Sequence, residues 1–235
     1  MPAEEREVGM LARGLNRSQM FTMPELISVN LGLPRPIDTP NGPVLSAIFK
    51  SPTGERVRAR GYNLEGDGQA DLSAHGGENK AVYGYPYEHY STWAAELGRD
   101  DLGPGQFGEN LTTKGLLETE VCVGDVLRIG SAVLEVSQPR SPCFKLGIRM
   151  GDPTFVRRFL QSGRPGFYFR IVEEGALQRG DVIERIERGA TGITIYEVWD
   201  LSFGEADDPE RLDAALGIPT LGPEWIKPMR AKRQV

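Results

Sequence analysis

Short runs of β-branched and aromatic residues, separated by turn residues, recur along much of the chain. Runs of this kind, with alternating apolar and polar positions, are typical of half-buried β-strands. They predict strands at ELISVN, SAIFK, KAVYGY, DVLRIGSAVLEVS, FYFRIV and DVIERIER. Gly130 and Ser131 alone separate residues 125–129 from 132–136, which predicts a tight hairpin. The spacing of the runs predicts a largely antiparallel barrel or sandwich with helices, a mainly β fold of the α+β class.

Helical patterns interrupt the strands at two places. Pro86 suits the first position of a helix, and Gly98 can end it. The apolar face of this helix consists of Tyr90, Trp93, Ala94 and Leu97. A second helix is predicted over 155–160, after the cap and proline start at Asp152 and Pro153.

Three short helical segments follow residue 188. Thr194 can cap the first, Asp208 and Pro209 open the second, which ends at Gly217, and Pro223 opens the third. Segments this short must pack on each other or on the barrel, because isolated short helices are marginal in water. We therefore expect a poorly structured or weakly helical extension over 1–22, a β-barrel domain over 23–188 and a three-helix subdomain over 189–235.

The composition is that of a globular protein, with 39% apolar and 26% charged residues. A net charge of -6 argues against a general nucleic-acid binder, whose affinity depends on many Lys and Arg contacts to phosphate. The apolar stretches are too short to cross a membrane, and the N-terminal segment is charged throughout, so neither membrane insertion nor secretion is expected. Two cysteines form no disulfide framework, and we expect a cytoplasmic protein.

The two cysteines differ in their surroundings. Cys122 alternates with valines in EVCVGD and is predicted to fill one face of a strand. Cys143 follows Pro142 in QPRSPCFKL, between Arg140 and Lys145. An arbitrary cysteine is usually buried and inert. Here the loop-like, basic context favours a thiolate, the form that ligates metals and attacks electrophiles.

Two glycine-rich segments are candidates for ligand contact. In LEGDGQADLSAHGGENK, glycines can bring backbone N–H groups and His75 close to a ligand, although a long surface turn is the alternative. The acidic residues there lack the spacing of an EF-hand. In GQFGENLTTK, Asn110 and Thr112 can donate hydrogen bonds to a ligand, while Glu109 either contacts the ligand or anchors the loop. His89 is predicted to be a surface or packing residue of the first helix.

Taken together, DGQADLSAHGGENKAVYGYP, FGENLTTKGLLETEVCVGDVLRIG, EVSQPRSPCFKL and GRPGFYFRI resemble the MOSC domain family, and specifically its YiiM-like branch. These segments occur in family order over roughly 45–188, and the helical tail is similar to the three-helix domain of that branch. The resemblance implies a β-barrel in which Cys143 coordinates the molybdenum of a pterin cofactor (Mo-molybdopterin). The residues expected to bind the cofactor are His75, Lys80, Asn110, Arg140, Lys145, Arg149, Tyr168 and Arg170.

Related proteins reduce N-hydroxylated compounds, including hydroxylamino purines, so the resemblance implies a molybdenum-dependent reductase. The sequence shows no flavin, nicotinamide or iron–sulfur motif, so a separate flavoprotein is expected to donate electrons. Two alternatives stay open: a sulfur carrier that uses a persulfide on Cys143, and a non-catalytic protein that stores or delivers the cofactor. Whether the chain forms a homodimer also stays open.

Overall fold

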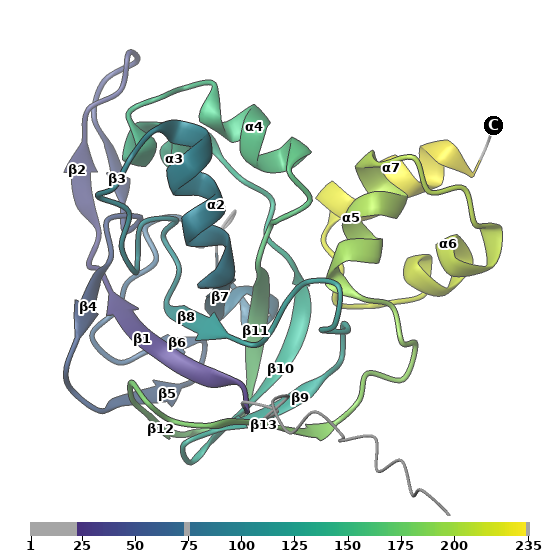
Figure 1. The fold of residues 1–235 in the computed structure, drawn as a ribbon, viewed down its shortest axis with the longest axis horizontal. Coiled ribbons are helices and arrows are strands. Elements are labelled where there is room, and N and C mark those ends of the chain that lie inside the picture. Colours follow the sequence, from purple (N-terminus) through teal and green to yellow (C-terminus); the bar gives the residue numbers. More distant parts are fainter. Residues whose placement is uncertain (1–22, 73–75, 234–235) are drawn as a thin grey trace, which may run out of the picture.

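The computed structural model describes residues 23–72 and 76–233. Its centre is a curved eight-stranded sheet in the order β13-β9-β10-β11-β7-β8-β1-β4 (Figure 1). These strands are β1 (Glu25–Leu31), β4 (Ser51–Thr53), β7 (Val82–Pro86), β8 (Leu111–Lys114), β9 (Val126–Ile129), β10 (Ala132–Pro139), β11 (Phe167–Glu173) and β13 (Ile183–Glu187). Neighbouring strands are antiparallel except for β7 and β8, which run parallel. The predicted α+β class is confirmed.

The remaining strands form two small sheets. One has the order β12-β5-β6 and comprises Gly175–Leu177, Val57–Arg60 and Asn63–Leu64. The other pairs β2 (Arg35–Ile37) with β3 (Val44–Ser46), a hairpin that projects beyond the main sheet (Figure 1).

The curvature of the main sheet brings β1 near β13. An isolated bridge joins Glu25 to Val182, and the backbone N–H of Leu26 donates to Asp181 O at 2.9 Å. No continuous ladder joins β1 to β13 in the described part of the chain, so the predicted closed barrel is not shown.

The predicted hairpin is present between β9 and β10, with Ala132 opposite Ile129. Gly130 has φ 59°, a left-handed conformation that the two-residue turn requires and that costs glycine little. The apolar positions of both strands, Leu127, Ile129, Leu134 and Val136, are buried in the main core. This hairpin leads along β10 directly to Arg140 and Cys143.

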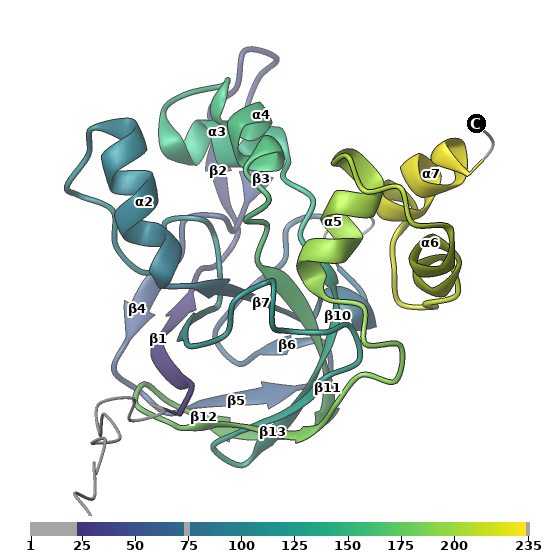
Figure 2. The same ribbon diagram turned by 45° about the vertical axis from the view of Figure 1, so that its right-hand side comes forward.

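Three helices, α2 (Glu88–Leu97), α3 (Phe144–Met150) and α4 (Phe155–Gln161), lie beside one another at one end of the sheet, as Figure 2 shows. A 3₁₀ turn, η1 (Glu78–Lys80), precedes β7. The helices bury an aromatic cluster that includes Tyr85, Trp93, Phe107, Phe155 and Phe159.

Helix α2 confirms the predicted face and its end at Gly98, but its predicted start was wrong. Pro86 is the last residue of β7, where it lies opposite Thr113 of β8, and the helix begins at Glu88. Helix α3 was not predicted at all, since it contains Gly147, a residue of low helix propensity.

The three C-terminal helices are confirmed: α5 (Ile195–Phe203), α6 (Pro209–Leu216) and α7 (Pro223–Lys232). The Thr194 hydroxyl accepts from the Glu197 N–H while the Glu197 carboxylate accepts from the Thr194 N–H, a complete capping box. The helices form a unit beside β10 (Figure 2). Trp225 anchors this unit, because its ring is fully buried and its Nε1 donates to Pro139 O at 3.1 Å.

Two strand predictions need correction. Only Ser46 of SAIFK lies in a strand, while residues 47–50 form an irregular segment. Cys122 is fully buried as predicted, but it makes an isolated bridge with Thr194 rather than lying within a strand. The predicted extension 1–22 lies outside the described residues. None of the helices described here is long and apolar enough to span a membrane.

Candidate active site

A cavity of about 610 Å³, counted with its open mouth, lies between the sheet and the loops at its end. Three chain segments supply most of its wall: 46–50 after β3, 67–71 after β6 and 140–145 between β10 and α3. The lining residues are Ser46, Ala47, Ile48, Lys50, Asp67, Gly68, Gln69, Ala70, Asp71, Lys80, Tyr83, Gly108, Asn110, Arg140, Cys143, Lys145 and Tyr168. Six residues predicted to act at the site therefore line one cavity: Lys80, Asn110, Arg140, Cys143, Lys145 and Tyr168.

Cys143 is half-buried at the N-cap of α3, in the loop that follows β10. Its backbone is extended, with φ -120° and ψ 169°, and its carbonyl accepts from the Leu146 N–H at 2.9 Å. The thiol lies close enough to Arg140 and Tyr168 for its charge to influence the pKa of both groups. The sequence therefore folds so that the thiol shares the cavity with a permanent cation.

Arg140 is the most unusual charged group of the cavity. Its side chain is 5% exposed, and its guanidinium carbon lies 4.9 Å from the ring centroid of Tyr83 and 5.4 Å from that of Phe159. Its Nη1 is buried and makes no hydrogen bond within the described residues. A buried, charged N–H without an acceptor is costly, so this atom is suited to an anionic ligand.

Lys145 supplies a second cation from the first turn of α3. It is buried apart from its exposure to the cavity, and no ion pair joins it to any described residue. Arg140 and Lys145 together give one side of the cavity a positive lining, although the chain as a whole is acidic. Such a local field favours a phosphate or a thiolate.

Tyr83 and Tyr168 form the aromatic side of the cavity, with ring centroids 5.3 Å apart. The Tyr83 hydroxyl donates to Pro165 O at 2.9 Å. Burial raises the pKa of Tyr168, and the nearby Arg140 opposes this effect only in part. The Tyr168 phenol therefore stays protonated near neutral pH and can donate a hydrogen bond.

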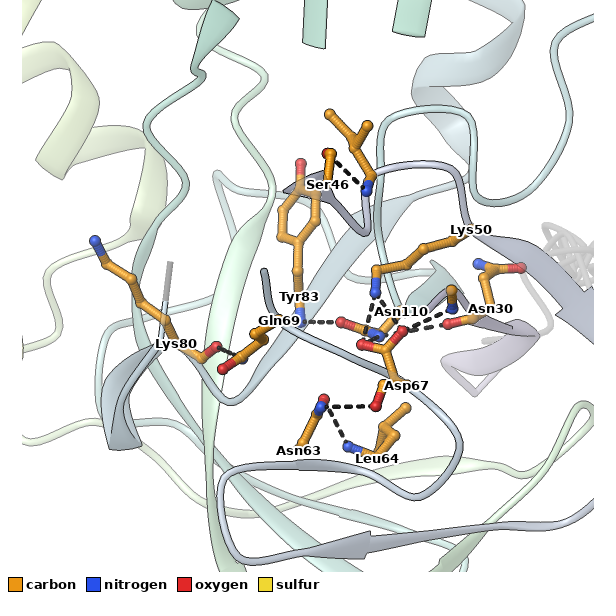
Figure 3. A network of polar contacts seen from close by, with 12 residues as sticks. Asn30, Ser46, Lys50, Asn63, Leu64, Asp67, Gln69, Lys80, Tyr83 and Asn110 are labelled. Atoms are coloured by element: carbon orange, nitrogen blue, oxygen red, sulfur yellow. Dashed lines mark hydrogen bonds and ion pairs between the residues drawn. The ribbon is translucent and has the colours of Figure 1, made fainter. Parts of the chain in front are cut away.

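A buried ion pair, drawn in Figure 3, also lines the cavity. Lys50 Nζ donates to the two carboxylate oxygens of Asp67 at 2.5 and 2.6 Å, and Asp67 also accepts from the Gly32 N–H at 2.8 Å. Burial lowers the pKa of Lys50, against the raising effect of Asp67. Sequence reasoning missed both residues, because a lysine at the end of an apparent strand and an aspartate in a glycine-rich loop are each ordinary.

Asn110 lines the cavity, but its side chain hydrogen-bonds to other parts of the fold. Its Oδ1 accepts from the Tyr83 N–H at 3.1 Å, and its Nδ2 donates to Asp67 at 2.9 Å (Figure 3). Thr112 likewise donates internally, to Glu109 at 2.8 Å. Glu109 is fully buried and accepts from the N–H groups of Gly105 and Phe107, so the loop-anchoring alternative describes it.

Lys80 connects the cavity to the C-terminal helices. It lines the cavity and pairs with Glu224 of α7 at 2.9 Å. Burial is the main cause of the raised pKa of Tyr168, and Arg140 lowers that pKa in part. The negative charge of Glu224 adds a smaller raising effect. Helix α7 is therefore a part of the electrostatic surroundings of the site.

Two described residues that were predicted to act at the site, Arg149 and Arg170, do not line the cavity. Arg170 pairs with Glu135 at 2.6 Å and with Glu78 at 3.4 Å, so its charge is already matched, and it does not line the cavity. Arg149 does not line the cavity, and its guanidinium carbon lies 5.0 Å from the ring centroid of Phe49. His75 lies outside the described residues. His89 is half-buried and its Nε2 lies 2.7 Å from Glu118, as expected of a packing residue.

Comparison with known proteins agrees with this architecture. The MOSC domain model matches residues 71–184, and the model of the YiiM-like, 3-alpha helix domain matches residues 193–233. The chain is 40% identical over 200 residues to the Bacillus subtilis protein YflK, covering 85% of this chain and 90% of YflK. The crystal structure of YiiM from Geobacillus stearothermophilus superposes with a TM-score of 0.72 at 31% identity, covering 89% of this chain and 98% of that one.

A third relative carries a functional name. A Gibberella moniliformis protein named Reductase is 39% identical over 150 residues, which is 63% of this chain and 27% of that protein. The matched families, the fold and the curated relatives point the same way. The chain belongs to the MOSC domain family, and it carries the YiiM-like three-helix domain behind its MOSC domain.

Proposed function

We propose that the protein is a molybdenum cofactor-dependent reductase of N-hydroxylated compounds, such as hydroxylamino purines, with Cys143 as the protein ligand of the metal. The main support for the proposal is that Cys143 and Arg140 line the same cavity. The Nη1 of Arg140 is buried there and has no hydrogen-bond acceptor within the described residues. A thiolate is a soft ligand for a metal, and a guanidinium binds phosphate. A molybdenum–pterin cofactor carries both a metal of this kind and a phosphate.

The cavity fits such a group. Its lining brings a thiol, buried cations and two tyrosine side chains to one open cavity, and cofactor sites commonly combine apolar and aromatic walls with a few placed polar groups. Cys143 would hold the metal, and Arg140 and Lys145 would hold the phosphate. Lys80 also lines the cavity, with its charge paired to Glu224 of α7.

When bound, the cofactor would supply the two electrons of the reduction, in which the N–O bond breaks and two protons are taken up to give an amine and water. The chain binds and orients the reactants. The protonated Tyr168 phenol is suited to donate a hydrogen bond to the hydroxylamine oxygen, a contact that would help that oxygen leave as water. We take the electron donor to be a separate flavoprotein.

The comparisons support the proposal at a coarser level. The matched family is known for binding the molybdenum cofactor, and one relative is named Reductase. Because the match covers 27% of that relative, the activity of the whole relative applies to this chain only as a proposal.

The test uses protein expressed in a host that makes the cofactor. Molybdenum content and reduction of 6-N-hydroxylaminopurine with a supplied electron donor are measured on wild type, Cys143→Ala and Cys122→Ala. Cys122 is a buried thiol outside the cavity, so its variant controls for loss of a cysteine as such. We expect wild type and Cys122→Ala to bind molybdenum and turn over, and Cys143→Ala to lose both. Wild type without molybdenum, or Cys143→Ala that keeps it fully, would refute the ligand role.

Two other outcomes would replace the proposal by its alternatives. A reducible sulfur adduct on Cys143, found by intact-mass measurement in protein that holds no molybdenum, would indicate a sulfur carrier. Bound pterin without turnover of any N-hydroxylated base would indicate storage or delivery.

A further inference from the structure

The segment 47–50 separates two different environments. Ile48 and Lys50 line the cavity, whereas Phe49 between them does not. The ring of Phe49 instead packs against two guanidinium groups: the Arg35 carbon lies 4.3 Å from its centroid, and the Arg149 carbon lies 5.0 Å from it. Arg35 comes from β2 and Arg149 from the last turn of α3, so three separate elements meet here.

The two positive charges on this ring are not neutralised by any described carboxylate. No ion pair joins Arg35 or Arg149 to a described residue, whereas Arg170, Arg164 and Arg211 each reach a glutamate within hydrogen-bond distance. The Arg149 Nε is buried and has no hydrogen-bond acceptor among the described residues.

Charges of both signs lie near Arg149. Burial lowers the pKa of Arg149, and the charges of Arg35 and Arg99 lower it further, against a raising effect of the buried Glu109. Arg99 itself is neutralised by Asp101 at 2.7 Å. Arg35 and Arg149 therefore repel each other on the Phe49 ring, and a bound anion would reduce this repulsion.

We propose that Arg35 and Arg149, positioned by Phe49, form a second anion site that binds a phosphate group, outside the cavity that holds Cys143. A guanidinium stacked on an aromatic ring keeps its in-plane N–H donors available, and its planar fork matches phosphate oxygens. Two such groups match the charge of a phosphate dianion. Arg35 is exposed and Arg149 is half-buried, so the site is open to solvent.

The site rests on its own contacts and does not depend on the proposed reductase activity. The phosphate can come from inorganic phosphate or from the monoester of a nucleotide, since both offer the same oxygens.

Isothermal titration of the purified chain, with inorganic phosphate, with adenosine 5′-monophosphate and with adenosine, tests the proposal. The variants are Arg35→Gln and Arg149→Gln, with Arg56→Gln as the matched control. Arg56 is an exposed arginine just before β5, and its Nε donates to Gln178 at 3.2 Å. Hydrogen bonds from a charged donor are roughly twice as strong as those between neutral groups, so loss of one guanidinium removes a large part of the binding. We therefore expect Arg35→Gln and Arg149→Gln each to weaken phosphate binding by roughly tenfold or more, and Arg56→Gln to leave it unchanged.

A further variant, Lys145→Gln, separates this site from the cavity, where Arg140 and Lys145 also attract phosphate. Phosphate binding that remains in Lys145→Gln, and that is weakened when Arg149→Gln is added to that variant, supports the second site. Binding abolished by Lys145→Gln alone overturns it, as does equal binding in wild type and Arg149→Gln. A monophosphate that binds more tightly than inorganic phosphate identifies a nucleotide as the source, and equal affinities identify inorganic phosphate. Adenosine that binds as tightly as its monophosphate would overturn phosphate recognition.

Discussion

The buried pair of Lys50 and Asp67 gives the sharpest prediction about stability. The exposed fractions of the two side chains are 8% and 2%, so neither charge is solvated by bulk water. Asp67→Asn keeps the shape of the side chain and an oxygen for the Gly32 N–H, but it removes the negative charge. Breaking a buried pair by removing one partner costs about 3–5 kcal/mol. Because asparagine still offers an acceptor to Lys50, we expect the free energy of unfolding to fall by about 3 kcal/mol.

The pH dependence of this loss follows from the pKa of Lys50. Burial lowers that pKa below its ordinary value of 10.5, so below 10.5 the unfolded chain binds more protons at this site than the folded chain does. Stability therefore rises with pH as the pH approaches 10.5. Without the charge of Asp67 the pKa falls further. The deficit of Asp67→Asn should accordingly shrink as the pH is raised through this window.

Urea unfolding between neutral and alkaline pH measures both effects, with the slope of the transition as a check on two-state behaviour. Glu65→Gln, which breaks the exposed contact between Glu65 and Arg60 at 3.9 Å, is the matched control and should change stability by no more than about 0.5 kcal/mol. Lys50→Met in the Asp67→Asn background should recover most of the loss. A loss below about 1 kcal/mol, or no recovery in the double variant, would refute the reasoning.

Three further predictions concern the surroundings of the site. Glu224→Gln should break the ion pair between α7 and Lys80. In a double-mutant cycle with Lys80→Met, the free energy of unfolding in urea should show a coupling of about 0.5–1 kcal/mol between the two residues, and a coupling of zero would contradict this. Thr194→Ala removes one half of the capping box of α5 and should lower the free energy of unfolding by about 1 kcal/mol in urea, whereas Thr194→Ser should be nearly neutral. Gly166→Ala should cost about 1–3 kcal/mol by the same assay, because its φ is 62° and a Cβ would lie 2.5 Å from Gly84 O; an unchanged transition midpoint would count against this.

The elements with local signals could be predicted from the sequence. The cap at Thr194, the Asp208 and Pro209 start and the Gly130 turn each depend on hydrogen bonds or dihedral angles within a few residues, and the structure confirms all three. Pro86 misled the prediction because proline suits a helix start and a strand end equally well locally. Its pairing with Thr113 of β8, which decides between them, is a long-range contact.

The site divides in the same way. Cys143 and Arg140 could be singled out because they are close in sequence, in an unusual proline-containing segment. The pair of Lys50 and Asp67 could not, since only the fold brings these loops together. Arg170 does not line the cavity, and the reason is the converse: the sequence shows that a cation is present, but it does not show that Glu135 on the neighbouring strand pairs with it.

The central claim is that the thiol of Cys143 is a ligand of molybdenum. X-ray absorption at the molybdenum edge counts the sulfur neighbours of the metal directly, and Cys143→Ser changes one sulfur atom to oxygen with little change in shape. We expect one sulfur neighbour fewer per molybdenum in Cys143→Ser than in wild type and in Cys122→Ser. An unchanged sulfur count in Cys143→Ser would contradict it.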